Sequence, residues 1–261
     1  MDALLDFADD VRPRRWTIES AGGLGIRLAQ QLVRAGGDVV DVTATLAARV
    51  RLLADRHQDL TALRTQAVCR LHALIAALVP GGHQRRISAD AAASRLRAVH
   101  PATAVEAARR DLALDLVADI RRLDEGIAAV KTSTAAAVAA SGTTVTDVFG
   151  VGPIVAALLI GHTGDIARFP TAGHYASYNG TAPIEASSGR VVRHRLNQRG
   201  NRQLNHALHM AAVTQLRFDT PGRAYYQRKL DEGKSTKEAR RALKRKISDA
   251  VYRQLRADAC G

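Results

Sequence analysis

Apolar and polar positions follow two different periods in the first part of the chain. Residues 15–19 and 38–42 have the composition of short strands, whereas apolar residues between 26 and 35 recur at helical spacing. A further helix is expected at about 44–53. This order predicts a β-α-β-α piece with two parallel strands. Because a parallel sheet needs more strands and cover on both faces, we expect an incomplete α/β domain or one that borrows strands.

Longer helical periods follow. Leucine and alanine recur every three or four positions from about 54 to 78 and again from about 103 to 130, with breaks at Pro80, Gly81, Gly82 and Pro101 between them. Two such helices pack either as an antiparallel hairpin or as an intermolecular coiled coil. The Ala/Ser/Thr-rich stretch 132–146 is expected to run from helix into a linker.

The pattern therefore predicts a mostly α protein with a small α/β part. We expect a partial α/β domain at 1–53, coiled-coil helices at 54–131, a linker at 132–147 and a carboxy-terminal helical domain at 148–261. The last of these has an apolar stripe around which it can fold, formed by Leu204, Leu208, Val213, Leu216, Leu243, Ile247, Val251 and Leu255.

Charge is concentrated at the carboxy-terminal end. The chain has 261 residues and a net charge of +13, and the segment 190–261 alone holds 18 Lys and Arg against 6 Asp and Glu, a net +12. Such density attracts polyanions and gains from counterion release on a phosphate backbone. The alternative is a solvated tail. The apolar stripe in the same segment favours a folded, nucleic-acid-binding domain.

Composition excludes several other classes of protein. No apolar stretch reaches the roughly 18 to 20 residues of a membrane span, and the amino-terminal end is acidic where a signal peptide is basic. Two cysteines, Cys69 and Cys260, provide neither a disulfide framework nor a metal knuckle. We therefore expect a protein of the cytoplasm, associated with the nucleoid.

Two glycines precede an apolar helix at 154–160. Gly150 and Gly152 stand in the run Val-Phe-Gly-Val-Gly-Pro, which suits a helix-hairpin-helix element in which backbone N–H groups approach a phosphate. A plain turn between two packed helices is an equal alternative.

A serine pair stands directly before a row of arginines. Ser187 and Ser188 precede Arg190, Arg193 and Arg195. A serine hydroxyl among arginines can attack a phosphodiester, because the cations stabilise the charge that develops. A polar turn is the alternative that the residues alone favour.

Other patterns are weaker. The glycines at 22–25 lack the full spacing of a dinucleotide loop. His206 and His209 could ligate a metal, but they lack a third ligand and ordinary histidines are the alternative. His194 could contact phosphate or assist Ser188. On the expected carboxy-terminal helix, Arg240, Arg241 and Lys244 are candidate contacts to a nucleic-acid backbone.

The segment from Gly150 to Ala212 resembles the carboxy-terminal transposase domain of the insertion-sequence-110 (and 116/902) family. The matching elements are the Gly-x-Gly-Pro run, Gly164-Asp165-Ile166, Tyr178-Asn179-Gly180, Ser188-Gly189 and Arg199-Gly200-Asn201-Arg202. The resemblance implies that Ser188, with Ser187 as the nearby alternative, is a nucleophile that joins covalently to DNA. Asn197, Arg199, Asn201 and Arg202 are then expected at the nucleic acid.

The amino-terminal segment resembles the same family's RuvC-like domain, which binds divalent metal through four acidic residues. Arg15 to Gly25 matches the strand and turn that carry the glutamate, so Glu19 is the catalytic and metal-binding candidate. The other three acidic positions find no match. Mg²⁺ is expected for the family, but one glutamate cannot hold it. Metal-dependent cleavage is therefore expected to be weak or absent.

The family resemblance implies DNA transposition and recombination through a serine nucleophile, with a structured non-coding guide RNA as partner and homo-oligomers formed through the coiled coil. One alternative is a catalytically dead remnant that binds nucleic acid. Another is an interaction protein held together by its coiled coil, whose basic region is merely solvated.

Overall fold

The structure is a computed structural model that describes residues 15–19, 26–42, 46–79, 81, 87–185, 194–195, 197 and 199–259. Most of these residues are helical, which confirms the predicted mostly α class. Two compact units divide the chain, residues 1–49 and residues 50–261. Within the described ranges, no helix is long and apolar enough to cross a bilayer.

The first unit holds the two predicted strands. Strand β1 (Arg15–Glu19) pairs in parallel with β2 (Asp38–Val42), in a register that sets Arg15 opposite Asp38 and Glu19 opposite Val42. Helix α2 (Ile26–Arg34) connects them and packs on β2. The described part of this unit is thus one β-α-β piece with a two-stranded sheet.

The second unit begins with two long helices. Helix α3 (Leu46–Leu78) is continuous, so the expected change of element near residue 54 is wrong: no proline or glycine interrupts the helix there. Helix α5 (Ala104–Ala140) extends the predicted second helix into the Ala/Ser/Thr-rich stretch. Between them lies α4 (Ala89–Arg97), which the sequence analysis missed. Ser88 caps α4 and Thr103 caps α5 through their hydroxyl groups.

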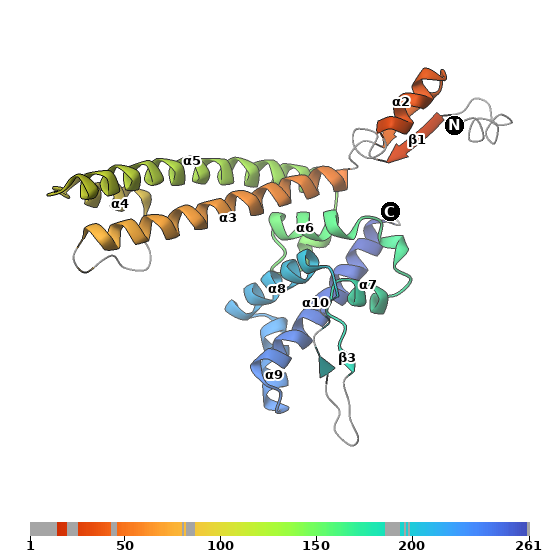
Figure 1. Cartoon of the computed structure of the whole chain (residues 1–261). Coiled ribbons are helices and arrows are strands. Elements are labelled where there is room, and N and C mark those ends of the chain that lie inside the picture. Colours follow the sequence, from red (N-terminus) through yellow and green to blue (C-terminus); the bar gives the residue numbers. More distant parts are fainter. Residues whose placement is uncertain are drawn as a thin grey trace. The chain divides into compact units, whose positions relative to one another are not determined.

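Helices α3, α4 and α5 share one core and form a helical hairpin with α4 at its far end (Figure 1). An ion pair between Arg64 Nε and Asp124 Oδ1, 2.5 Å apart, joins α3 to α5 along the hairpin. The buried residues that α3, α4 and α5 contribute are Ala67, Leu71, Ile75, Ala92, Ala93, Leu96, Ala113, Leu116, Val117 and Ile120.

The rest of the second unit is a helical domain. After the short 3₁₀ turn η1 (Val145–Asp147) come α6 (Pro153–Thr163), a second turn η2 (Ile166–Arg168) and α7 (Ala172–Tyr178). Two short strands, β3 (Ile184–Glu185) and β4 (His194–Arg195), precede α8 (Arg202–Arg217), α9 (Pro221–Asp231) and α10 (Thr236–Asp258). A capping box of Ser235 and Glu238 starts α10.

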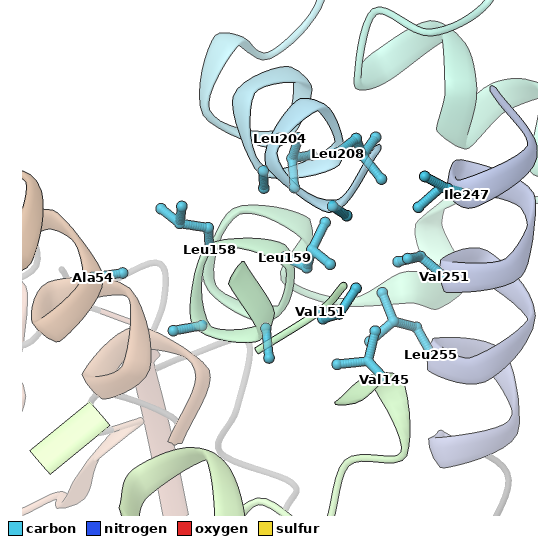
Figure 2. Packing of buried hydrophobic residues seen from close by; sticks show 14 of the residues in the cluster. Ala54, Val145, Val151, Leu158, Leu159, Leu204, Leu208, Ile247, Val251 and Leu255 are labelled. Carbon is cyan, nitrogen blue, oxygen red and sulfur yellow. The ribbon is translucent and has the colours of Figure 1, made fainter. Parts of the chain in front are cut away.

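Helix α6 is the centre of this domain. Its residues are apolar around the whole helix, and such a helix is stable only when neighbours enclose it. Leu158 and Leu159 lie between Leu204 and Leu208 of α8 on one side and the α10 side chains on another, with Ala54 of α3 nearby (Figure 2). The predicted apolar stripe is confirmed: its members on α8 and α10 are buried or half-buried in this core, namely Leu204, Leu208, Val213, Leu216, Leu243, Ile247, Val251 and Leu255.

A glycine in α6 permits the close approach of α3. A Cβ atom at Gly161 would lie 2.5 Å from Cβ and 2.7 Å from Cα of Arg51, distances that real Cβ atoms do not reach. Beside this contact, His162 Nε2 lies 3.5 Å from Asp55 Oδ1, and Gln58 Nε2 donates a hydrogen bond of 2.9 Å to Gln203 Oε1 on α8. The base of the helical hairpin is therefore fixed to the core of the helical domain.

We expect Gly161→Ala to lower the free energy of unfolding by about 1–3 kcal/mol, because the added methyl group must push α3 away from α6. Urea denaturation of the full chain measures this change. Gly173→Ala is the matched control: its Cβ would meet only Thr171 Oγ1, at an ordinary 3.4 Å, and alanine favours a helix over glycine by roughly 1 kcal/mol. Equal stability of the two variants would contradict the close contact.

Candidate functional site

The predicted site residues fall into two groups. Ser187, Ser188, Arg190 and Arg193 lie outside the described residues. Arg195 belongs to β4 and Glu19 to the last position of β1, where only the backbone is described. Those remaining are described with side chains, namely Gly150, Gly152, Asn197, Arg199, Asn201, Arg202, Arg240, Arg241 and Lys244.

The two short strands place the ends of the serine-bearing segment together. Ile184 pairs with Arg195 and Glu185 with His194, in antiparallel register. Residues 186–193, which contain both candidate serines, therefore leave and rejoin the described chain at paired positions. The predicted site residues after β4 continue directly from this point.

Hydrogen bonds connect the polar turn before β3, at residues 177–181, to the polar turn after β4, at residues 197–201. The backbone N–H of Asn201 donates to the carbonyl oxygen of Tyr178 at 2.7 Å, and Asn197 Nδ2 donates to the carbonyl oxygen of Ser177 at 2.9 Å. Asn205 Nδ2 donates to the carbonyl oxygen of Asn179 at 3.0 Å. The segment before β3 and the segment after β4 are thus held together by hydrogen bonds.

Two glycines allow these turns to touch. Gly180 has a φ of +74°, which favours glycine, and a Cβ on Gly200 would overlap the Cα and N atoms of Gly180. The motif glycines of Tyr178-Asn179-Gly180 and Arg199-Gly200-Asn201-Arg202 therefore have a packing role. They bring two segments that are distant in sequence into backbone contact.

Buried Asn179 connects this turn to α10. Its Nδ2 atom donates to Ser248 Oγ at 2.8 Å, while its Oδ1 atom accepts from the backbone N–H and the hydroxyl of Thr181. Asn179 and Ser248 are both fully buried. An unpaired buried amide would be costly, so this network fixes one orientation of the turn against α10.

Asn201 begins α8. Its Oδ1 atom accepts hydrogen bonds from the backbone N–H groups of Gln203 and Leu204, at 3.0 and 3.1 Å. Arg199 and Arg202, on either side of it, are exposed. The asparagine therefore has a structural role, and the two arginines are the members of this motif that are free to contact a ligand.

Lys244 is a buried cation. Its side chain is only 8% exposed, and its Nζ atom donates to Asn205 Oδ1 at 2.6 Å. Burial lowers the pKa of Lys244 to about 8. Among the residues that the structure describes, no carboxylate pairs with it. A lysine without a counter-ion is unusual in a protein interior.

Two cavities open on either side of Lys244. The first, of about 410 Å³, has a mixed lining that includes Gly180, Thr181, Glu238, Arg241, Lys244, Arg245 and Asp249. The second, of about 530 Å³, is lined by Asn197, Gly200, Arg202, Asn205, His206, His209 and Lys244. Asn197 and Lys244 belong to both linings, so the two cavities are neighbours along the turns described above.

The glycine pair before α6 lies on the opposite side of α8. Gly150, with a φ of +88°, packs so closely on α8 that a Cβ would lie 2.7 Å from the carbonyl oxygen of Ala211. Gly152 is the residue before Pro153, at the start of α6, and the space around it is open. This geometry accounts for Gly150 as a packing residue and leaves Gly152 accessible.

The described residues do not provide a magnesium site. In the ranges with defined placement, no three His, Cys, Asp or Glu side chains gather at one point. His206 and His209 have no such partner and instead share the second cavity with Lys244 and Arg202. Desolvation lowers the pKa of His209, and the nearby charges of Lys244, Arg240 and His206 lower it further.

Several important residues escaped the sequence analysis. Asn179 and Asn205 organise the site, and Asn205 orients the lysine. One feature of the sequence could have indicated Asn205. It directly follows Leu204, which belongs to the apolar stripe of α8, and a polar residue beside a buried leucine is a candidate for a buried hydrogen bond. Lys244 was expected as a contact to a nucleic-acid backbone, and its burial was not foreseen.

Comparison with known proteins identifies the same region. Residues 142–227 match the model of the transposase IS116/IS110/IS902 family. The matched segment starts before η1 and ends within α9, so it includes α6, both polar turns, the two short strands and α8. It stops before α10, which carries Lys244.

Similar curated proteins come from insertion elements. A 43.6 kDa protein of insertion element IS110 from Streptomyces coelicolor is 39% identical over 108 residues, and a 44.8 kDa protein of IS116 from Streptomyces clavuligerus is 34% identical over the same length. A 42 kDa protein of IS900 from Mycobacterium paratuberculosis is 35% identical over 109 residues. Each match covers 41% of this chain but 27% of the relative. The chain thus matches about a quarter of the length of these relatives.

We expect Lys244→Met to raise the free energy of unfolding at pH 7 by about 1–2 kcal/mol. Its pKa is lower in the folded chain than in the unfolded chain, so folding the charged lysine costs free energy below pH 8. Losing the hydrogen bond to Asn205 offsets part of the gain. As the pH rises from 8 to 10.5 the cost of charge burial disappears, and the stability advantage of the variant disappears with it.

Urea denaturation at pH 7 and at pH 10.5 measures the free energy of unfolding of wild type and variant at each pH. The control is Lys246→Met, an exposed lysine on the same helix, which we expect to change stability by less than about 0.5 kcal/mol. A variant Lys244→Met that is less stable than wild type at pH 7 would show that the lysine contributes to the fold.

Proposed function

We propose, since residues 142–227 carry a transposase domain of the IS116/IS110/IS902 family, that this chain takes part in DNA strand cleavage and joining during movement of an insertion sequence. The observation that carries the proposal is the placement of the serine-bearing segment. Its ends, at Glu185 and His194, are paired, and the turns that flank them line two cavities with basic residues.

The proposed chemistry is phosphoryl transfer to serine. The Oγ atom of Ser188 attacks a DNA phosphorus atom and forms a Ser–O–P bond, while the bond from phosphorus to one deoxyribose oxygen breaks. The serine proton is lost to solvent, and the released oxygen takes up a proton to become a hydroxyl group. Joining is the reverse reaction with the hydroxyl group of another strand. Ser187 is the nearby alternative nucleophile.

Cations supply the stabilisation that this reaction needs. Arg190, Arg193 and Arg195 are the proposed partners of the reacting phosphate, whose negative charge increases during attack. The exposed Arg199 and Arg202 and the half-buried Arg240 and Arg241 extend the basic surface over α8 and α10. These residues would hold the DNA backbone and fix its position without reading its sequence.

The remaining parts of the proposal rest on the family resemblance. The first unit, with Glu19 at the end of β1, is proposed as part of a RuvC-like domain. Gly152, at the open start of α6, is proposed to contact a phosphate as in a helix-hairpin-helix element. A guide RNA, oligomers formed through the α3–α5 hairpin and a divalent cation are proposed as partners. No step above is assigned to a metal ion, because the described residues do not form a site for one.

A second candidate function is nucleic-acid binding without catalysis. It is favoured by the basic cavities, whose residues do not depend on the serine segment or on Glu19. Such a chain could interfere with intact relatives by assembling with them. The two functions differ in whether a covalent product forms.

We expect a protein–DNA adduct that depends on Ser188. The full chain is incubated with labelled element-end DNA, a candidate guide RNA and Mg²⁺, then denatured and separated by electrophoresis. Wild type and Ser187→Ala should retain protein-linked label, whereas Ser188→Ala should lose it. Each variant removes one hydroxyl group from the same pair, so each is the control for the other.

The absence of an adduct has a distinct meaning when DNA binding is measured in parallel. Binding that weakens steeply between low and physiological salt, with no adduct, would replace the enzyme by the binding function. Absence of both would contradict both functions and leave the interaction protein.

A further inference from the structure

The two cavities beside Lys244 differ in charge. The first contains carboxylates, Glu238 and Asp249, among its cations. Among the described residues that line it, the second contains none: these are four basic side chains, two amides and a glycine, namely Arg202, His206, His209, Lys244, Asn197, Asn205 and Gly200. A cavity with this lining repels cations and attracts an anion. We call it the carboxylate-free cavity.

Lys244 is positioned for a ligand in this cavity. It lies on α10 and crosses to Asn205 of α8, whose Oδ1 atom accepts one of its three N–H bonds. Asn205 is itself held, because its Nδ2 atom donates to the carbonyl oxygen of Asn179. The ammonium group is therefore fixed in the cavity wall, with two further N–H bonds for which the described residues show no acceptor.

The missing counter-ion indicates what the ligand is. Burying a charge without a partner is costly, and proteins normally supply a carboxylate. Here the described residues that line the carboxylate-free cavity with Lys244 are two amides, a glycine, two histidines and the cation Arg202. An anion from outside the chain is the partner that would neutralise Lys244 and Arg202 together.

Resting on the proposed function, we propose that the carboxylate-free cavity binds a phosphate group of the nucleic-acid backbone, with Lys244 as its buried contact and Arg202 as its exposed one. The cavity volume of about 530 Å³ is within the range of about 300–1,000 Å³ that is common for bound small groups, which leaves room for a phosphate and its flanking sugars. A compact ammonium group is a common phosphate contact in proteins.

Binding at this site depends on pH in a predictable direction. Burial lowers the pKa of Lys244 to about 8, so the lysine is charged at pH 7 and neutral at pH 9.5. A phosphodiester keeps its single negative charge throughout. Desolvation lowers the pKa of His209 below its usual 6.5, and the nearby charges of Lys244, Arg240 and His206 lower it further, so His209 loses rather than gains charge in the cavity. Affinity should therefore fall as the pH rises through 8.

Other charged and titratable groups lie near Lys244. On its own helix they are Glu238, Arg240, Arg241, Arg245, Lys246 and Asp249, on α8 they are Arg202 and the two histidines, and Lys234 precedes α10. Tyr225 of α9 lines the first cavity. Arginine stays protonated to about pH 12, carboxylates ionise near pH 4 and tyrosine titrates near pH 10. The comparison of wild type with Lys244→Gln therefore assigns the change between pH 7 and 9.5.

The test is fluorescence anisotropy of the full chain with a labelled 20-base-pair DNA duplex. Two further probes, a single DNA strand and an RNA strand of the same sequence, distinguish the possible sources of the phosphate. Dissociation constants are measured from 50 to 200 mM salt at pH 7 and from pH 7 to 9.5 at one salt concentration. The variants are Lys244→Gln, which retains an amide donor for Asn205, and Arg202→Gln.

We expect Lys244→Gln to weaken duplex binding at pH 7 by about ten-fold, to reduce the slope of log K against log salt by about 0.9, and to abolish the fall in affinity above pH 8. Arg202→Gln should reduce the slope similarly but keep the dependence on pH. The matched control is Arg253→Gln, an exposed residue of α10 that lines neither cavity. It removes the same charge and should change affinity by less than about three-fold.

Three results would overturn the inference while leaving the proposed function intact. These are unchanged affinity in Lys244→Gln, an equal loss in Arg253→Gln, and a wild-type affinity that is flat from pH 7 to 9.5. If circular dichroism shows that Lys244→Gln does not fold, the inference is tested by the salt dependence of Arg202→Gln and by the pH dependence of wild-type binding. A wild-type chain that binds none of the three probes would overturn both proposals.

Discussion

The enclosure of α6 is the constraint on which the helical domain depends. Because this helix is apolar around most of its surface, it must be covered by several neighbours: α8, α10 and the base of α3, seen in Figure 2, together with the end of α5. Gly161 permits the close approach of α3 to α6, and Gly150 permits the close approach of the turn before α6 to α8. The same packing leaves α8 and α10 side by side at a fixed separation. Residues of α8 and α10 outside this core form the hydrogen-bonded cluster of Asn179, Asn205, Ser248 and Lys244 and contribute to the lining of both cavities.

A polar cluster at this place works against stability. Asn179, Asn205 and Ser248 satisfy one another's hydrogen bonds, so the network costs little. Lys244 differs, since a hydrogen bond to an amide does not neutralise its charge. A leucine at this position would continue the apolar stripe of α10, in which Leu243 and Ile247 are its neighbours. A cation therefore stands where the fold favours an apolar residue, and the phosphate contact proposed above would account for it.

The local pattern of apolar and polar residues predicted some of the elements correctly, but it did not predict all helix boundaries or the contacts between distant helices. The bounds of β1 and β2 and the stripe on α8 and α10 followed from period and composition, because each depends on neighbouring residues only. The single helix α3 and the added helix α4 did not, since a change in apolar spacing was interpreted as a break and a short capped helix was overlooked. Lys244 was predicted as a contact to a nucleic-acid backbone, with no expectation that it would be buried. Its burial arises from contact with α8, a partner 39 residues away in sequence.

In this domain the side-chain amides form hydrogen bonds within the protein, whereas the cations line the cavities, and this difference limits what the domain can recognise. The side-chain amides of Asn179, Asn201 and Asn205 are engaged within the protein, so they are not available to read base edges. Among the described residues that line the two cavities, the side chains left to meet a nucleic acid are mainly guanidinium, ammonium and imidazole groups. Such groups bind phosphates, which are the same at every sequence. If the proposed function is correct, this surface positions a strand, and the choice of sequence must come from another part of the assembly, such as base pairing with the proposed guide RNA.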